Sequence, residues 1–477
     1  MKARTKALEN LMALTEPALL YKKLRNGQLL SVVSNDTPNW LCALNPWIAF
    51  AKANAYGALG DIERARRYIR LLGAVWPLPF LKREIAKYLG RTQPALVREL
   101  LGPLNPDNQM RLAFELVAGV PPASFGFAGF KHGSSALDVL WCNRLAPAAV
   151  DRVASVNQLL QSGGCSAVAW AADEPFKLRY APFSDPCAAP DKKKEVLVTV
   201  LVTAYNCGMY VRQSVESLLA QTHTRIQIMV ANDASTDDTQ AQLSTLATAD
   251  ARLRVFNLPE NVGTYAAKSL MLQFAEGEYV VCHDSDDLAD PTFIAKSLAA
   301  LVADSSKVAV ISSWFRLDEE LRIFPGAVRR FWPLLSINHS SLMLRTAVLK
   351  DLGGWDVPRV AADTELFERL RTIYGSRAVL QLTSPLTIGS LRADSLMNDA
   401  QVGAMQAAAF RRRVEYRESW VAWHTRCKKK GIKLVMASPF DDARPFAVPA
   451  EFKVCPEAIA RCFRAMEASE PTLTVPE

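Results

Sequence analysis

The pattern of apolar and polar positions changes once along the chain, after about residue 180. Before that point, Leu- and Ala-rich stretches broken by prolines predict helices. Beyond it, short apolar runs alternate with stretches of helical spacing, such as residues 211–219. Alternating strands and helices with short connections predict an α/β fold with a mainly parallel sheet that is covered on both faces.

Four buried strands are predicted in the alternating region. They are apolar runs rich in β-branched residues, at 197–203, 226–231, 253–257 and 279–282. Helices are expected between them, including one over about 265–274. Ligands of such sheets bind beyond the carboxyl ends of the strands, so the chemistry is expected there.

Composition divides the chain further, because 477 residues exceed one ordinary core. A segment of prolines and small residues that ends in three lysines marks a linker. We therefore expect a mostly helical accessory domain at 1–180, a linker at 181–194, an α/β domain at 195–400 and a basic, aromatic helical extension at 401–477.

Two features of the first domain leave alternatives open. The run Ala58-Leu59-Gly60-Asp61, followed by Ala65, Tyr68 and Leu71, is similar to one tetratricopeptide hairpin. A plain helical bundle is the alternative, because repeat architectures need several stacked units. The glycine-rich segment 124–133 is interpreted as a loop rather than a phosphate cradle, since no strand leads into it.

Localisation is predicted from hydropathy and cysteine usage. No run of about 18 apolar residues predicts a membrane span, and Glu9 and Glu16 argue against a secretory signal. The nine cysteines are odd in number and never spaced as CxxC, which argues against a disulfide framework and a zinc site. We therefore expect a cytoplasmic protein.

Positive charge is concentrated near the C-terminus. The chain carries a net charge of +8, and residues 411–433 contain nine Lys and Arg but only two Glu. With Tyr416, Trp420 and Trp423 interleaved, this segment suits an interfacial helix at the inner face of the plasma membrane. A solvated or packing helix is equally open. Nucleic acid is not expected as a partner, because no recognition motif accompanies the charge.

Polar residues follow each predicted strand, at 203–206, 232–238, 261–263 and 283–287. Any one of these runs is typical of turns and helix caps. Parallel strands bring all four to one edge. Asp284, Asp286 and Asp287 then repel one another unless protons or a cation offset their charge. Mg²⁺ or Mn²⁺ suits such oxygen ligands, together with a second anion such as a diphosphate that leaves in the reaction.

Six motifs occur in the order and spacing of the family-2 glycosyltransferases, which the chain resembles over about 195–397. They are Thr203-Ala204-Tyr205-Asn206, Asn232-Asp233-Ala234-Ser235-Thr236-Asp237, Asn261-Val262-Gly263, Asp284-Ser285-Asp286-Asp287, Gly353-Gly354-Trp355-Asp356 and Ala362-Asp363-Thr364-Glu365-Leu366. The resemblance implies a GT-A fold, an inverting mechanism and a nucleoside-diphosphate sugar donor, most often a UDP-sugar.

The resemblance also implies residue roles. Asp286 is the expected metal ligand, with Asp284 shared between the metal and the donor. His339 is a candidate third ligand or a structural histidine. The expected donor-binding residues are Thr203, Ala204, Tyr205, Asn206, Asp233, Ser235, Asn261, Gly263, Lys268, Asp284 and Ser285. The expected acceptor or closing-loop residues are Trp355, Asp356, Arg392 and Ser395.

Asp363 is the expected general base. Inversion needs a base that removes a proton from the acceptor hydroxyl as that oxygen attacks the anomeric carbon. A carboxylate at the start of a helix can be held rigidly for this task, and it can cap the helix at the same time.

The predicted function is an inverting, metal-dependent glycosyltransferase acting on a glycan, lipid-linked glycan or other glycoconjugate, in bacterial surface polysaccharide synthesis. Gln227, Asn232 and Ala362 stand where the family often has acids. They keep open the alternative of a degenerate scaffold that binds nucleotide sugars without turnover. The Gln-x-x-Arg-Trp motif of processive synthases is absent after Asp363, so polymer extrusion is not expected.

Overall fold

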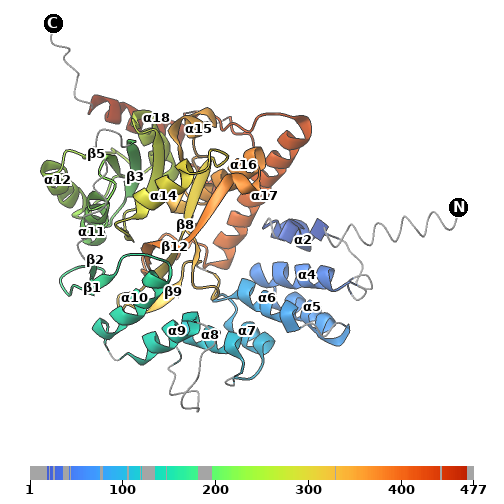
Figure 1. Cartoon of the computed structure of the whole chain (residues 1–477). Helices are drawn as coiled ribbons and strands as arrows, with labels where there is room; N and C mark the ends of the chain where they lie inside the picture. Colours follow the sequence, from blue (N-terminus) through green and yellow to red (C-terminus); the bar gives the residue numbers. More distant parts are fainter. Residues whose placement is uncertain are drawn as a thin grey trace, which may run out of the picture. The chain divides into compact units, whose positions relative to one another are not determined.

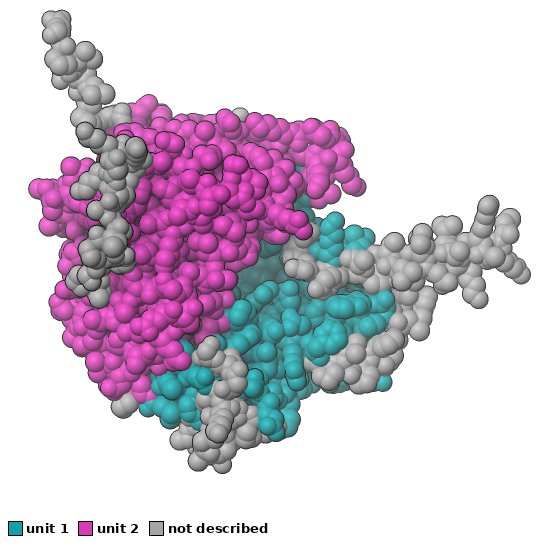
Figure 2. Space-filling model, viewed as in Figure 1, with its two compact units in different colours: residues 1–145, 327–333, 393–423 teal, residues 146–326, 334–392, 424–477 magenta. Residues whose placement is uncertain are grey.

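The computed structural model describes residues 19–20, 22–24, 27–35, 42, 45–75, 79–104, 107–118, 120, 135–146, 148–180, 196–327, 329–440 and 443–469. The predicted linker at 181–194 and the glycine-rich segment 124–133 lie outside these residues. Figure 2 colours two compact units. Unit 1 comprises Met1–Leu145, Ala327–Pro333 and Ala393–Trp423, and unit 2 comprises Ala146–Gly326, Leu334–Arg392 and His424–Glu477.

Unit 1 is helical where the structure describes it, which confirms the helical character predicted for the N-terminal part (Figure 1). Asn45 starts α4 by accepting a hydrogen bond from the backbone N–H of Trp47, and Pro46 occupies the first helical position. Its helices are α2 (Leu29–Val33), α4 (Pro46–Ala58), α5 (Ile62–Val75), α6 (Pro79–Leu89), α7 (Pro94–Leu101), α8 (Gln109–Val117) and α9 (Ser135–Leu145).

Unit 2 contains a mixed, mostly parallel sheet of ten strands within the described residues, in the order β5-β4-β3-β6-β11-β8-β12-β7, with β9 and β10 paired to β8. β3, β4, β5 and β6 are parallel, as are β8 and β12, whereas β7 and β11 run antiparallel to their neighbours. The strands are β3 (Val198–Ala204), β4 (Ile226–Asn232), β5 (Leu253–Asn257), β6 (Tyr279–Asp284), β7 (Asp287–Ala289), β8 (Ala309–Leu317), β9 (Ile323–Pro325), β10 (Ser336–Ile337), β11 (Met343–Arg345) and β12 (Val379–Ser390). A separate hairpin pairs β1 (Val168–Trp170) with β2 (Leu178–Tyr180).

Helices cover this sheet on both faces. Leu201, Met229 and Val280 point to one face and join a core cluster with residues of α13, α16 and α18. Elsewhere on the sheet, α11 packs against α12 and β7, and α14 packs against β8 and β12. The helices are α10 (Val153–Ser162), α11 (Gly208–Leu219), α12 (Thr239–Ala249), α13 (Thr264–Met271), α14 (Phe293–Val302), α15 (Thr346–Asp351), α16 (Ala362–Tyr374) and α18 (Pro456–Ala468). Short 3₁₀ turns are η2 (Val150–Arg152), η3 (Leu272–Phe274), η4 (His339–Ser341), η5 (Ser376–Ala378) and η6 (Ala450–Phe452).

Helix α17 (Ala407–Lys430) carries most of the basic segment. Its aromatic residues Tyr416, Trp420 and Trp423 are buried, as in a packing helix, whereas Lys428, Lys429 and Lys430 are exposed. None of the helices that the structure describes combines the length and apolar character needed to cross a membrane.

A buried ionic network holds the start of α16. Glu365 and Arg369 are both 0% exposed, and Nη2 of Arg369 lies 3.2 Å from Oε2 of Glu365. Oε1 of Glu365 is 2.9 Å from Nε2 of His424. The Arg369 guanidinium also donates to the carbonyls of Leu352 and Gly354, at 2.6 and 2.5 Å. The network therefore ties α16 to the turn that precedes Trp355.

Replacing Arg369 by methionine is expected to lower the free energy of unfolding by about 3–5 kcal/mol, because it leaves a buried carboxylate and two carbonyls without their cation. Urea unfolding followed by circular dichroism measures this. The matched control is Arg371→Met, which removes an ion pair between half-buried groups on the same helix. That pair is worth about 0–1 kcal/mol. Equal losses in the two variants would contradict this account.

Candidate active site

The carboxyl ends of β3, β4 and β6 bring the predicted donor-binding residues to one edge of the sheet. Oγ1 of Thr203 lies 2.7 Å from Oγ1 of Thr264. Oγ of Ser235 accepts the backbone N–H of Asn206 at 3.0 Å, which joins the turns after β3 and β4. Tyr205 is 52% exposed at this edge, so its ring is open to a ligand.

Asp233 is the buried centre of this donor side. Its two carboxylate oxygens accept the backbone N–H groups of Val262 and Gly263, each at 2.8 Å. Gly263 has φ +77°, a conformation that favours glycine. Burial raises the pKa of Asp233 to about 6, although the two N–H groups and Arg359 act in the opposite direction. Asp233 therefore titrates close to physiological pH.

Asp284, at the end of β6, is paired with Lys268. Their Oδ1 and Nζ atoms are 3.7 Å apart, and Oγ of Ser340 donates to Oδ2 of Asp284 at 2.7 Å. Burial alone would raise the pKa of Asp284, but Lys268 and Ser340 lower it overall. Burial would lower the pKa of Lys268, yet Cys282, Asp284 and Asp363 raise it overall. The charges of Asp284 and Asp363 thus both favour the charged form of Lys268.

Asp286 keeps one carboxylate oxygen available. Oδ2 lies 2.9 Å from Nη2 of Arg392 and accepts the Ser390 hydroxyl at 3.0 Å. Both contacts use Oδ2, and the side chain remains 23% exposed. Oδ1 makes no hydrogen bond within the described residues, so this oxygen can meet a ligand.

Asp287 differs from the other two acids, because it is buried and its Oδ1 accepts the backbone N–H of Ser390 at 3.2 Å. Burial and the charges of Asp286 and Asp284 raise its pKa well above the ordinary value. All three acids act electrostatically on Arg316, a buried residue of β8.

Protein cations therefore offset the charge of the acidic cluster: Lys268 beside Asp284, Arg392 beside Asp286, and Arg316 near all three acids. In the sequence, the repulsion of three carboxylates predicted a metal ion. That repulsion is already reduced by side chains from α13, β8 and the segment that follows β12, so by itself it does not require a metal.

The carboxylate oxygens of Asp284 and Asp286 nevertheless fit a divalent cation that takes its remaining ligands from a substrate. Within the described residues, no group of three or more His, Cys, Asp or Glu side chains could hold a metal ion by itself. Oδ1 of Asp286 and the carboxylate of Asp284 offer oxygen ligands two positions apart in sequence. Mg²⁺ binds in this way, through one or two carboxylates plus phosphate and water. The ring of His339 packs edge-on against Phe367, with centroids 5.3 Å apart.

Asp363 is the second residue of α16. Its Oδ1 accepts the backbone N–H and the hydroxyl of Thr364, at 2.6 and 3.3 Å, which leaves Oδ2 without a partner in the described residues. Ala361 just before the helix has φ +71°, a left-handed conformation that is strained for alanine and common at functional sites. A rigid carboxylate with one free oxygen is the arrangement that a general base needs.

The remaining predicted site residues differ in their burial, their contacts and the unit to which they belong. Ser285 is buried and accepts the Cys207 thiol at 3.3 Å. Trp355 is buried, and Asp356 is held by Arg444 at 2.6 Å. Ser395 belongs to unit 1, unlike the other predicted site residues.

Several neighbours of the site were not anticipated from sequence. Arg316 is the charged residue in a strand that otherwise holds apolar residues and two serines, which is a signal that could have marked it. Ser340 lies beside His339 in a motif that sequence reasoning used only for its histidine. Arg359 and Arg444 have no motif around them. Gln227, which seemed a departure near the site, lies at the other end of β4 and bonds Thr199 and Phe274.

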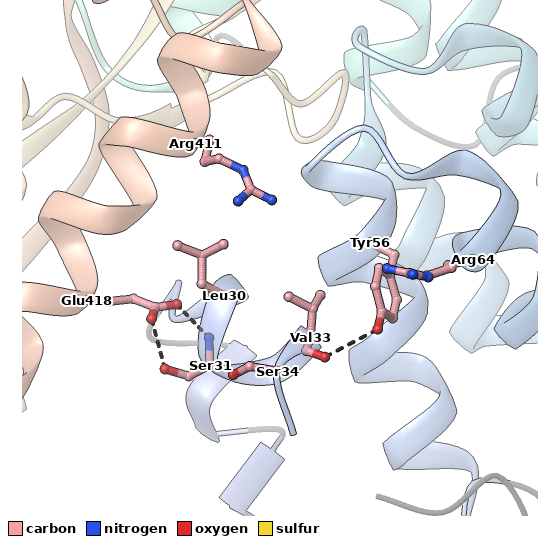
Figure 3. A pocket seen from close by; sticks show the side chains of 8 residues that line it. All are labelled: Leu30, Ser31, Val33, Ser34, Tyr56, Arg64, Arg411 and Glu418. Carbon is pink, nitrogen blue, oxygen red and sulfur yellow. Dashed lines mark hydrogen bonds between the residues drawn. The ribbon is translucent and has the colours of Figure 1, made fainter. Parts of the chain in front are cut away.

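A pocket of about 340 Å³ lies elsewhere, within unit 1 (Figure 3). Glu418 accepts the backbone N–H and hydroxyl of Ser31 on one side, and the Tyr56 hydroxyl donates to the carbonyl of Val33 on the other. Its lining residues are Leu30, Ser31, Val33, Ser34, Tyr56, Arg64, Arg411 and Glu418. None of the predicted donor, metal or base residues lines it.

The mixed, mostly parallel sheet with helices on both faces has the GT-A fold that the sequence predicted. Residues 199–349 match the model of glycosyl transferase family 2. The match confirms the resemblance noted in the sequence and the predicted fold class.

Relatives match over part of their length. The glycosyltransferase GlyG of Streptococcus pneumoniae is 32% identical over 123 residues, covering 26% of this chain and 40% of that protein. A chondroitin synthase of Pasteurella multocida is 32% identical over 117 residues, covering 24% and 12%. The crystal structure of S. aureus TarS 1-349 with UDP-GlcNAc has a TM-score of 0.33 and 21% identity, covering 42% of this chain and 59% of that one. The chain thus spans less than two thirds of each relative.

Proposed function

We propose that this chain is an inverting, metal-dependent glycosyltransferase. It moves a sugar from a nucleoside-diphosphate donor, a UDP-sugar, to a hydroxyl of a glycan or glycoconjugate in surface polysaccharide synthesis. The observation that carries the proposal is that, within the described residues, Asp286 and Asp363 each keep one carboxylate oxygen without a hydrogen bond, while Asp284 is paired with Lys268. The relative named chondroitin synthase supports a polysaccharide product.

The donor is bound along the ends of β3, β4 and β6. Asp233 accepts a hydrogen bond from the N–H of the nucleobase, while Tyr205 and the turn at Asn206 line the nucleoside. When Mg²⁺ or Mn²⁺ is bound, it offsets the charge that develops on the departing diphosphate. Asp286 and Asp284 would hold that ion, and Lys268 adds positive charge beside Asp284.

Transfer needs a base on the face opposite the leaving group. Oδ2 of Asp363 takes the proton from the acceptor hydroxyl as its oxygen attacks the anomeric carbon. The bond between that carbon and the diphosphate oxygen breaks, and the electron pair leaves with the diphosphate. The hydrogen bonds from Thr364 to Oδ1 keep the carboxylate oriented throughout.

A scaffold that binds nucleotide sugars without turnover is the second candidate. The Arg392–Asp286 ion pair favours it, because an arginine already occupies one oxygen of the proposed metal ligand. Metal-dependent release of UDP from a panel of UDP-sugars separates the two. Release that requires the metal and Asp363 supports the enzyme, whereas UDP-sugar binding without release supports the scaffold.

Donor binding is expected to depend on pH through Asp233, whose pKa is about 6. The charged carboxylate accepts the nucleobase N–H more strongly than the protonated acid does, so affinity falls as pH falls through 6. With roughly a tenth of the groups charged one unit below the pKa, affinity for UDP-glucose at pH 5 is weaker than at pH 7 by up to about tenfold. Isothermal titration calorimetry measures this.

The control for the pH experiment is Asp233→Asn, which cannot titrate and is expected to give weak binding that is flat between pH 5 and 7. UDP-glucose is chosen because its diphosphate stays ionised over this range. The same pH dependence in the variant and the wild type would assign the titration to another group.

A further inference from the structure

Arg316 is a buried arginine whose hydrogen-bonding capacity is unmet. It is 9% exposed and lies near the end of β8, with its guanidinium 4.3 Å from the centroid of the Trp314 ring. Its Nε is buried without a hydrogen-bond partner in the described residues. Buried donors are nearly always paired, and a charged one left unpaired costs free energy. Nε of Arg316 therefore has capacity for one more hydrogen bond, although the guanidinium already interacts with the charges of three acids.

Three neighbours share this property. Nε1 of Trp314, Oγ1 of Thr387 and Oδ2 of Asp287 are also buried without partners in the described part of the chain. The strand register pairs Thr387 with Trp314, and it pairs Gly389 with both Arg316 and Asp287. Paired residues on neighbouring strands point to the same face. Asp287, Trp314, Arg316 and Thr387 thus form one group, called here the β8 patch.

Gly389 stands in the middle of the β8 patch. A Cβ at this position would lie 2.7 Å from Cζ3 of Trp314 and 3.2 Å from Cγ of Arg316. Glycine inside a strand weakens the strand, and it often marks a place where another group approaches closely. Here it makes room for the indole ring and the arginine stem.

The patch lies beyond β6 from the strands that carry the predicted donor-binding turns. β5, β4 and β3, which carry the donor-side turns, precede β6 in the order of the sheet, whereas β8, β12 and β7 follow it. The acidic cluster at the end of β6 separates the two sides. Asp284, Asp286 and Asp287 all act on Arg316 electrostatically, so the patch adjoins the place where transfer is proposed.

We propose that the β8 patch binds one carboxylate of an acidic sugar in the acceptor glycan, with Arg316 as its cation and Trp314 and Thr387 as hydrogen-bond donors. This rests on the proposed glycosyl transfer and names its acceptor class. A planar guanidinium matches a carboxylate edge. Because three acids lie near Arg316, a singly charged carboxylate meets less repulsion there than a doubly charged phosphate.

The test is calorimetric binding to the full-length protein with UDP and Mn²⁺ present. The probes are a glucuronate-containing chondroitin tetrasaccharide and the same tetrasaccharide with its carboxyls reduced to alcohols. The wild type is expected to prefer the acidic form by about tenfold or more, as for a hydrogen bond to a charged group. Arg316→Gln is expected to abolish the preference, and Arg316→Lys to retain part of it.

Two further variants keep the test decisive. Trp314→Phe keeps an aromatic ring but lacks the indole N–H. It is expected to weaken the binding of the acidic probe by a few fold, through loss of one hydrogen bond. Arg345→Gln removes an exposed arginine from β11 and is expected to bind both probes like the wild type.

The outcomes separate this inference from the proposed function. UDP binding without any preference for the acidic probe, or a preference that survives in Arg316→Gln, overturns the carboxylate site alone. Loss of UDP affinity in Arg316→Gln assigns the arginine to the donor diphosphate and also overturns it. If the wild type binds no UDP at all, the proposed function itself fails, and the acceptor site fails with it.

Discussion

Asp363→Asn is expected to reduce transfer by about 10²- to 10⁴-fold, the range that general base catalysis contributes. The change removes the free carboxylate oxygen that takes the acceptor proton but preserves the size of the side chain. The amide oxygen still accepts the Thr364 N–H, so the helix start is retained. Turnover is measured as UDP release with saturating donor.

Donor affinity provides the internal control for Asp363→Asn. The base touches the acceptor, so the dissociation constant for the UDP-sugar is expected to stay unchanged while kcat falls. Asp351→Asn, an exposed acid at the end of α15, is the matched control and is expected to retain full activity. Wild-type turnover in Asp363→Asn would show that another group acts as the base.

Asp286→Asn is expected to lower turnover by roughly 10²- to 10³-fold, which corresponds to several kcal/mol of lost charge stabilisation. The mechanism of this loss differs from that at Asp363. Without a carboxylate at 286, a divalent ion loses a ligand, and Arg392 loses its ion-pair partner. UDP binding is therefore expected to lose its response to Mn²⁺, which calorimetry with and without the metal measures.

The pair of variants distinguishes the two candidate functions. An enzyme loses turnover in both, and loses metal-linked donor binding only in Asp286→Asn. If Asp286→Asn bound UDP with the same response to Mn²⁺ as the wild type, Asp286 would not be the metal ligand.

The sequence predicted the donor side of the fold closely. The strand expected at 253–257 is β5 with the same bounds, and β3 and β4 differ from expectation by one residue. These elements are buried, β-branched runs between amphipathic helices, so local pattern and tertiary burial favour the same structure. α13 ends at Met271, and the 3₁₀ turn η3 completes the length expected for that helix.

The acceptor side was less predictable. β7, β9, β10 and β11 have two or three residues each, too few for a local periodicity, and β7, β10 and β11 pair with strands far along the chain. The charge balance of the acidic cluster depends on Lys268, Arg316 and Arg392, which come from three separate elements. Sequence reasoning therefore found an excess of negative charge where the folded chain supplies its own cations.

The buried pair of Glu365 and His424 illustrates the same limit. Glu365 lies in a motif, but its partner is 59 residues further along the chain. Such a pairing follows from how α16 and the end of α17 pack, and composition does not encode it. The general base could be assigned from its motif, whereas the network that holds its helix could not.

A crystal structure with UDP and Mn²⁺ tests the central claim most directly. We expect the nucleobase of UDP to contact Asp233, and Mn²⁺ to lie between the diphosphate and Oδ1 of Asp286. We also expect that the free oxygen of Asp363 faces the open side of the diphosphate. A nucleotide bound away from the strand ends, or a diphosphate whose metal does not touch Asp286, would contradict the claim.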